Sequence, residues 1–193
     1  MGWTSKDFDP DVLSSALLTI MKQHLSKASG IQQTKDPDIE ATDIVEYEGR
    51  MRVSGLEKLN NICYIAAVNF YLTKADADKQ QKTKGVLVLY MEMESAGKFF
   101  KALEIPFRED EDDASMMEGC GRFAQIVAEG LNKEISAKGY APLVLSGPTS
   151  YKNNVMEGVA ISPDQKTKHE IGYFYFKHKA IAVELSLAPL PKK

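Results

Sequence analysis

The segment from Glu109 to Ser136 constrains the fold most strongly, because it predicts one long helix with two chemically different faces. Apolar residues recur at spacings of three and four, which predicts a buried stripe made of Met117, Cys120, Ala124, Val127, Leu131 and Ile135. Polar residues recur in the same way on another face, namely Glu118, Arg122, Gln125, Glu129 and Asn132. Such a stripe of acid, guanidinium and carboxamide groups is a candidate functional surface.

Composition and charge limit the classes of function. The chain has 193 residues, 44% of them hydrophobic, so we expect one domain over residues 1–193. Its net charge of −3 comes from 24 basic and 27 acidic residues and favours neither nucleic acid nor anionic lipid as a partner. The amino end lacks the apolar core of a signal peptide, and no run is apolar enough to span a membrane. We therefore expect a cytoplasmic protein, and without a glycine-rich phosphate loop we expect no cofactor.

Helix and strand signals follow one another in an order that predicts an α+β fold. The run Asp9 to Asp11 is typical of a helix start, and the apolar stripe after it predicts a helix that ends near Ser29-Gly30. A short helix is expected from Glu94 to Leu103, a hairpin loop from Thr73 to Lys84 and a turn from Ser146 to Ser150. After a polar loop that follows the first helix, β-branched and aromatic residues predict strands at Asp43 to Met51, Ile62 to Leu72, Gly85 to Met93, Leu143 to Leu145, Val155 to Ile161, Glu170 to Phe176 and Ala180 to Leu187. These elements predict long helices packed on a largely antiparallel sheet.

Cysteine, histidine and acidic clusters offer less favoured chemistry. Cys63 and Cys120 lie in apolar segments, which indicates buried thiols rather than a disulfide or a nucleophile. The three histidines are isolated from carboxylates at metal-ligand spacing, so no metal site is expected. The acidic run from Glu109 to Asp113 lacks the glycine and the alternating ligands of a calcium loop, and a solvated helix start explains it better.

Short local motifs carry a family resemblance. The opening around Phe8-Asp9-Pro10, the run Ile135 to Tyr140 and the later Ser146 to Thr149 resemble parts of the CheX branch of the chemotaxis phosphatases. In that family they correspond to the amino-terminal helix, the exit from the long helix and a strand that ends in a Pro-Thr turn. CheC and FliY are relatives of this branch. Together with the final strands, the resemblance covers most of the chain and implies a CheC/CheX-like fold.

The resemblance also implies an activity and a partner. Family members remove the aspartyl phosphate from a phosphorylated response-regulator receiver domain of the CheY type, using a Glu-x-x-Asn pair on the long helix. The asparagine amide orients the attacking water, and the glutamate anchors the partner by pairing with a lysine. Because an acyl phosphate is already a good leaving system, the positioning of a water molecule can supply much of the acceleration.

The register of that pair decides which residues would act. If the match at Ile135 to Tyr140 fixes the alignment, Arg122 occupies the position of the family's glutamate (the acid slot), and Gln125 occupies that of its asparagine (the amide slot). Gln125 keeps an amide on a longer stem. Arg122 reverses the charge that is expected to meet the partner's lysine, and like charges repel.

Two other registers stay open. A shift by one helical turn places Glu118 in the acid slot but Gly121 in the amide slot, and a literal Glu-x-x-Asn motif occurs at Glu129 and Asn132. All of these positions share one helix face. The candidate catalytic residues are therefore Gln125, Glu118, Glu129 and Asn132, and the candidate partner-binding residues are Glu118, Arg122 and Gln125.

Purely structural explanations compete with these roles. Ser115-x-x-Glu118 has the form of a capping box, in which each side chain satisfies a free amide at a helix start. Arg122 follows Glu118 by four residues, and Glu129 follows Gln125 by four. Pairs at that spacing stabilise a solvated helix face by roughly 0.2–0.5 kcal/mol each.

Three classes of function follow. The first is a phosphatase that acts on a phosphorylated receiver domain, and the second is a catalytically inactive interaction module with the same fold. The third is a small-ligand-binding domain. The resemblance favours a signalling partner, and it also implies that copies can pair through their sheets into a homodimer. Glu170 to Phe176, which is rich in tyrosine and phenylalanine, is the candidate strand for that contact.

Overall fold

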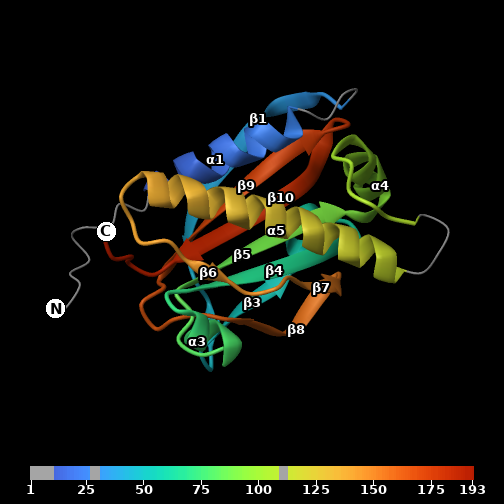
Figure 1. The fold of residues 1–193 in the computed structure, drawn as a ribbon. Helices are drawn as coiled ribbons and strands as arrows, with labels where there is room; N and C mark the ends of the chain where they lie inside the picture. Colours follow the sequence, from blue (N-terminus) through green and yellow to red (C-terminus); the bar gives the residue numbers. More distant parts are fainter. Residues whose placement is uncertain (1–10, 27–30, 109–112) are drawn as a thin grey trace.

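The computed structural model describes residues 11–26, 31–108 and 113–193. Helices and an antiparallel sheet combine in one structure, as the α+β prediction requires (Figure 1). The elements are α1 (Asp11–Leu25), β1 (Gln33–Asp43), β2 (Glu46–Tyr47), β3 (Arg50–Ser54), α2 (Gly55–Leu59), β4 (Cys63–Tyr71), α3 (Lys74–Asp78), β5 (Gly85–Glu92), α4 (Met93–Ala102), α5 (Asp113–Ala137), β6 (Val144–Leu145), β7 (Thr149–Lys152), β8 (Asn154–Ala160), β9 (Thr167–Tyr175) and β10 (His178–Leu187).

Seven strands form the main sheet in the order β1-β9-β10-β5-β4-β6, with β7 also paired to β4. Its strand pairs are antiparallel. The central strands β4 and β5 are buried almost throughout, which explains their continuous apolar runs. A small sheet, β2-β3-β8, forms a second antiparallel unit.

Each face of the main sheet has its own apolar core. On one face, side chains of α1, α4 and α5 pack on the sheet. On the other face, α2 and the small sheet cover strands β4, β5 and β10. Figure 1 shows α1 and α5 lying beside each other across the same face, where they are in contact. The long helix is therefore held between a sheet and a second helix, with its remaining side open to solvent.

The first helix is confirmed, but the polar segment after it is a strand rather than a loop. The helix ends at Leu25, before the expected end at Ser29-Gly30, which lies outside the described residues. Residues 33–43 form β1, which pairs with β9 along the open edge of the main sheet. Most of its side chains are exposed, so it has no apolar alternation to mark it in the sequence. Charged residues and Pro37 suit such an edge position.

Three further boundaries differ from the sequence predictions. The expected strand Asp43 to Met51 is interrupted by a turn at Glu48 and Gly49, both with positive φ (50° and 75°), which makes a hairpin of β2 and β3. The expected loop Thr73 to Lys84 contains α3, whose start is capped by the Thr73 hydroxyl. The expected turn Ser146 to Ser150 is shorter, because β7 begins at Thr149.

The strand predicted to join two copies is not an edge strand. β9, which contains most of the predicted segment Glu170 to Phe176, is paired on one side to β1 and on the other to β10. Tyr173 and Tyr175 are both 2% exposed, since their side chains lie in the core under the helices. The aromatic residues of β9 therefore serve the core of this molecule, and the homodimer stays a prediction without this strand as its contact.

Within residues 11–26, 31–108 and 113–193, no helix is both long and apolar enough to cross a membrane. Nor does any group of three or more His, Cys, Asp or Glu side chains gather there in a way that could hold a metal ion.

Candidate partner-binding surface

Close contacts on three sides fix the position of α5. Its apolar stripe is buried against the sheet from Cys120 to Ile135. Gly130 lies against Ile20 of α1, where an added Cβ would come within 3.1 Å of that side chain. Gly121 lies against β7 and the segment before it, where a Cβ would come within 2.8 Å of the Ser150 hydroxyl and 3.4 Å of Pro148. Glycine lowers helix propensity by about 1 kcal/mol relative to alanine, so these positions favour close packing over helix stability.

The polar stripe emerges on the solvent side of this helix, as predicted. Glu118 and Arg122 are exposed and form an ion pair, with 2.5 Å between Oε1 and Nη2. Their side chains are 64% and 50% exposed. The two opposite charges lie one helical turn apart and form a neutral pair on the solvent-exposed surface.

Gln125 and Glu129 form the next pair along the stripe. The Gln125 Nε2 group donates to Glu129 Oε1 at 3.0 Å. Gln125 is half-buried, and its Oε1 atom is buried without a hydrogen-bond partner among the described residues, whereas Glu129 is exposed. The amide nitrogen of Gln125 thus lies at the surface, and its oxygen points inward.

Asn132 has a structural role in this arrangement. Its Nδ2 group donates to the Leu143 carbonyl at 2.7 Å, and its Oδ1 accepts from the Leu143 N–H at 2.8 Å. These two bonds attach the last turns of α5 to the segment that leads into β6. Both ends of the amide are therefore engaged within the chain.

The capping box at Ser115 and Glu118 is absent, because the helix begins two residues earlier, at Asp113. The Ser115 hydroxyl instead accepts from the backbone N–H of Arg108 at 2.8 Å.

Asp113, at the start of α5, accepts from the Tyr64 hydroxyl at 2.8 Å and from Lys152 at 2.5 Å. These two hydrogen bonds, Lys152 first, lower the pKa of Asp113. A carboxylate is also favoured at a helix start by the helix dipole, a signal that the sequence did contain.

One apolar side chain interrupts the solvent face of α5. Ile126 is 38% exposed, between the turns that carry Arg122 and Glu129. Sequence reasoning did not single it out, since a single isoleucine beside a polar stripe is not a pattern. A single exposed apolar side chain is common on protein surfaces, and in a protein contact through this face Ile126 would lie in the buried, less charged centre.

The burial of the cysteines and the hydrogen bonds of two of the histidines indicate structural rather than catalytic roles. Cys63 and Cys120 are both buried and unpaired, and burial raises the pKa of Cys63 to about 12, which disfavours a reactive thiolate. His169 contacts the Ser14 hydroxyl through Nδ1 at 2.6 Å. His178 contacts Glu92 through Nε2 at 2.6 Å. Neither cysteine nor either of these histidines lies on the polar stripe of α5.

Known proteins match this chain in fold but not in sequence. No family model matches the sequence, and no curated protein matches it significantly. Solved structures do match over nearly the whole chain. The chemotaxis protein CheX from Desulfovibrio desulfuricans is 13% identical with a TM-score of 0.56, over 91% of this chain and 98% of that one.

The chain has the CheC/CheX fold. A CheC-like superfamily protein from Shewanella sp. PV-4 matches 94% of this chain and 100% of its own, at 13% identity and a TM-score of 0.53. The CheX–CheY–BeF3–Mg²⁺ complex from Borrelia burgdorferi matches 93% of this chain and 97% of that one, at 12% identity and a TM-score of 0.53. The fold predicted from the resemblance is confirmed, and the residues on α5 must be judged from their own geometry.

Proposed function

We propose that this chain binds the receiver domain of a phosphorylated response regulator through the exposed face of α5. The carrying observation is that charged side chains face solvent on a helix whose other sides are fixed by the sheet, α1 and the β6–β7 segment. The Borrelia burgdorferi complex supports the choice of partner, since a CheX of the same fold is there bound to CheY. Such a partner implies that the protein works in the cytoplasm.

The side chains of this face suit a reversible contact. Ile126 offers an apolar centre, and the ion pair of Glu118 with Arg122 offers both signs of charge beside it. An exposed pair of this kind is worth only about 0.3–0.5 kcal/mol within the helix. It can therefore be exchanged for charges on a partner at little cost.

Dephosphorylation is a second candidate function, and the surface amide of Gln125 favours it. The resemblance places Gln125 in the slot of the amide that orients water, and its Nε2 group is held at the surface by Glu129. Asn132 is less suited, because both ends of its amide bond Leu143. In the register shifted by one turn, the amide slot falls on Gly121, which is buried and carries no amide.

A binding titration tests the first proposal. Receiver domains from the same organism are titrated calorimetrically against the chain, with and without beryllofluoride and Mg²⁺ to mimic phosphorylation. We expect tighter binding of the activated form of one receiver, and a loss of about tenfold or more in affinity for Ile126→Asp. Lys79→Gln, directly after α3, is the surface control and should bind like the wild type. Equal affinity for Ile126→Asp would remove α5 as the docking site.

Phosphate release tests the second. The receiver that binds is phosphorylated, and its loss of phosphate is followed with wild type, Gln125→Ala and Asn132→Ala. If Gln125 orients the water, its alanine variant abolishes the added rate, and folded Asn132→Ala retains it. Decay unchanged by the wild-type protein for every receiver would exclude a phosphatase and leave an interaction module.

A further inference from the structure

A groove of about 360 Å³ lies on the small sheet β2-β3-β8, and none of the residues of the polar stripe on α5 lines it. Its lining includes the three most exposed large apolar side chains of the described residues, namely Val45 at 72%, Tyr47 at 76% and Met156 at 89%. The next, Leu56, is 54% exposed. Single exposed apolar side chains are common, but several that gather around one groove are a feature of binding sites.

The pairing of the small sheet places these side chains on its solvent side. Met51 of β3 is buried in the core, so its neighbour Arg50 faces outward. Tyr47 is paired with Arg50 and shares that outer face. On β8, Val155 is buried, and the next residue, Met156, faces solvent. Since the outer face of such a sheet normally carries polar side chains, the packing of a single chain does not explain the apolar lining of this groove.

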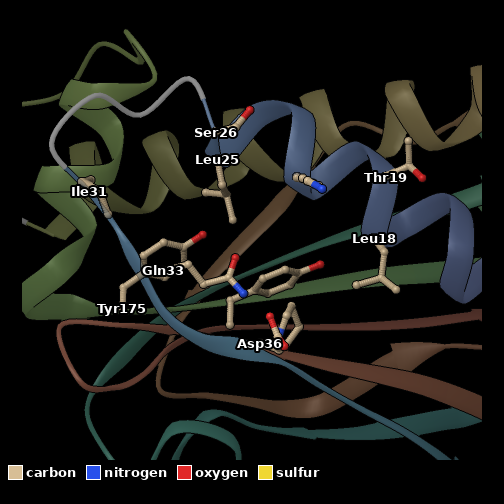
Figure 2. Close-up of a pocket in the computed structure, with 11 residues that line it drawn as sticks. Leu18, Thr19, Leu25, Ser26, Ile31, Gln33, Asp36 and Tyr175 are labelled. Atoms are coloured by element: carbon tan, nitrogen blue, oxygen red, sulfur yellow. The ribbon is translucent and has the colours of Figure 1, made fainter.

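The cavity between α1 and β1 differs in this respect. Figure 2 shows Leu18, Leu25 and Ile31 on its wall. All three pack on the core that α1 shares with the main sheet. The chain therefore already covers the apolar side chains of that cavity, whereas those of the small-sheet groove are left open to solvent.

The charged side chains around the groove leave this face with a net negative charge. Arg52 pairs with Glu57, with 2.6 Å between Nη2 and Oε1. Arg50 donates from Nε to the backbone carbonyl of Glu157, also at 2.6 Å. These two arginines stand against four carboxylates, a net charge of −2, from Glu46, Glu48, Glu57 and Glu157.

Three of the four carboxylates are open to a partner. Glu46, Glu48 and Glu157 are exposed, and none of them forms an ion pair with a described residue. A second copy of the chain would bring the same net negative charge to the contact, and like charges repel. Charge complementarity therefore favours a different protein that carries positive charge.

From this arrangement we infer that the groove of the small sheet binds another protein through a basic amphipathic segment, one whose apolar side chains are flanked by lysine or arginine. The apolar side chains of the segment pack against Val45, Tyr47 and Met156. Its cations pair with Glu48 and Glu157. The small sheet and α5 cover opposite faces of the main sheet, so this contact does not depend on receiver binding.

Three synthetic peptides test the chemistry of the partner. The first is an amphipathic helix with a leucine stripe flanked by lysines, the second has glutamate in place of every lysine, and the third has serine in place of every leucine. Fluorescence anisotropy gives their affinities for the full chain, and NMR shift changes locate the contact. We expect the first peptide to perturb β2, β3 and β8, and each of the others to bind about tenfold more weakly or less.

Two variants of the chain test the groove itself. Met156→Ser should weaken the lysine peptide about tenfold, and Glu157→Lys should weaken it about threefold. Both side chains are exposed, so both variants should unfold like the wild type. Ile39→Ser and Glu40→Lys, at exposed positions on β1, are the matched controls and should bind like the wild type.

The same measurements can overturn the inference. Equal affinity for the lysine and glutamate peptides would remove the charge preference, and equal losses for Met156→Ser and Ile39→Ser would remove the groove as the site. Absence of saturable lysine-peptide binding at millimolar concentrations also overturns it. Sedimentation equilibrium of the free chain tests the other occupant, since a dimer that Met156→Ser dissociates would assign the groove to a second copy.

Discussion

Acid–base pairs occur on both sides of the main sheet, and the two groups differ in how far water reaches them. On α5, the ion pair of Glu118 with Arg122 is more than half exposed on average. On the opposite face, under α2, the Glu184 side chain is 0% exposed. It contacts Lys168 at 2.6 Å and Lys58 at 2.9 Å, and it accepts from the Tyr90 hydroxyl at 2.6 Å. We refer to these residues, with Glu170 bonded to Lys58, as the Glu184 cluster.

Because the two groups differ in solvent exposure, the buried one stabilises the fold and the exposed one is available for binding. Burial alone would raise the pKa of Glu184, but the charges of Lys168 and Lys58 and the hydrogen bonds of the cluster outweigh it and lower that pKa. The cluster is therefore committed to holding α2 on the sheet. An exposed pair on one helix contributes little to folding, so the stripe on α5 is free to change partners.

Replacement of the buried carboxylate should have the largest effect on stability. Glu184→Gln keeps the size of the side chain but leaves Lys168, whose side chain is only 13% exposed, without its charge partner. We expect the free energy of unfolding to fall by about 3 kcal/mol, the low end for breaking a buried pair, because Lys58 keeps Glu170. Urea unfolding measures the change.

The exposed acid provides the control. Glu118→Gln should change the free energy of unfolding by no more than about 0.5 kcal/mol. A loss for Glu184→Gln as small as that of Glu118→Gln would mean that the two groups do not differ in the way their burial implies.

Within the stripe itself, Asn132 and Gln125 should behave differently. Asn132→Ala removes both hydrogen bonds to Leu143, which is 5% exposed, and leaves its backbone groups without partners. We expect a loss of about 1–3 kcal/mol in the free energy of unfolding. Gln125→Ala should cost at most about 0.5 kcal/mol, since it breaks one exposed bond and removes a buried oxygen without a partner. Thermal unfolding of the two variants side by side measures this contrast, and equal losses would contradict a structural role for Asn132.

The sequence predicted the fold where side-chain pattern determines structure. The 3.6-residue periodicity identified α5, and enrichment in β-branched and aromatic residues identified β4 and β5, because these elements are buried on defined faces. β1 was missed because backbone pairing at a sheet edge holds it, and exposed side chains carry no period. The interior position of β9 was missed for the same reason, since its outer neighbour is β1.

The site was predictable only in part. Periodicity placed Glu118, Arg122 and Glu129 on an exposed face, as the structure has them. The partner of Asn132 lies eleven residues further on, after the turn at the end of α5, and no local pattern specifies that contact. The groove of the small sheet depends on where β2, β3 and β8 lie relative to one another, which is a property of the tertiary structure.

A titratable pair of intermediate burial should make stability depend on pH. His178 is 45% exposed and bonds Glu92, which is 6% exposed. The bond to Glu92 raises the pKa of His178. For Glu92, burial opposes ionisation, but bonds from Ser95, His178 and Asn61 outweigh it and lower the pKa.

The two shifts define a window of pH. The histidine contribution is complete below its unfolded pKa, near 6.5, and is lost as pH rises through the raised folded value. The glutamate contribution is complete above its unfolded pKa and is lost as pH falls through the lowered folded value. We expect stability to decline from about pH 6 to pH 8 by less than about 1 kcal/mol, since the histidine is partly solvated. Urea unfolding at several pH values should show a smaller decline for His178→Gln, and an identical decline would assign it to other groups.

Mutation of the exposed ion pair should have the smallest effect on stability. It should affect binding of the receiver much more than folding. A double-mutant cycle of Glu118→Gln and Arg122→Gln should yield a coupling of about 0.3–0.5 kcal/mol in urea unfolding at low salt, and less near about 1 M salt, where surface charges are screened. The same four proteins should differ more strongly in their affinity for the activated receiver, because there the charges meet a partner rather than water. A cycle that moved stability by several kcal/mol, with receiver affinity unchanged, would place this stripe in the same class as the Glu184 cluster and remove its role in docking.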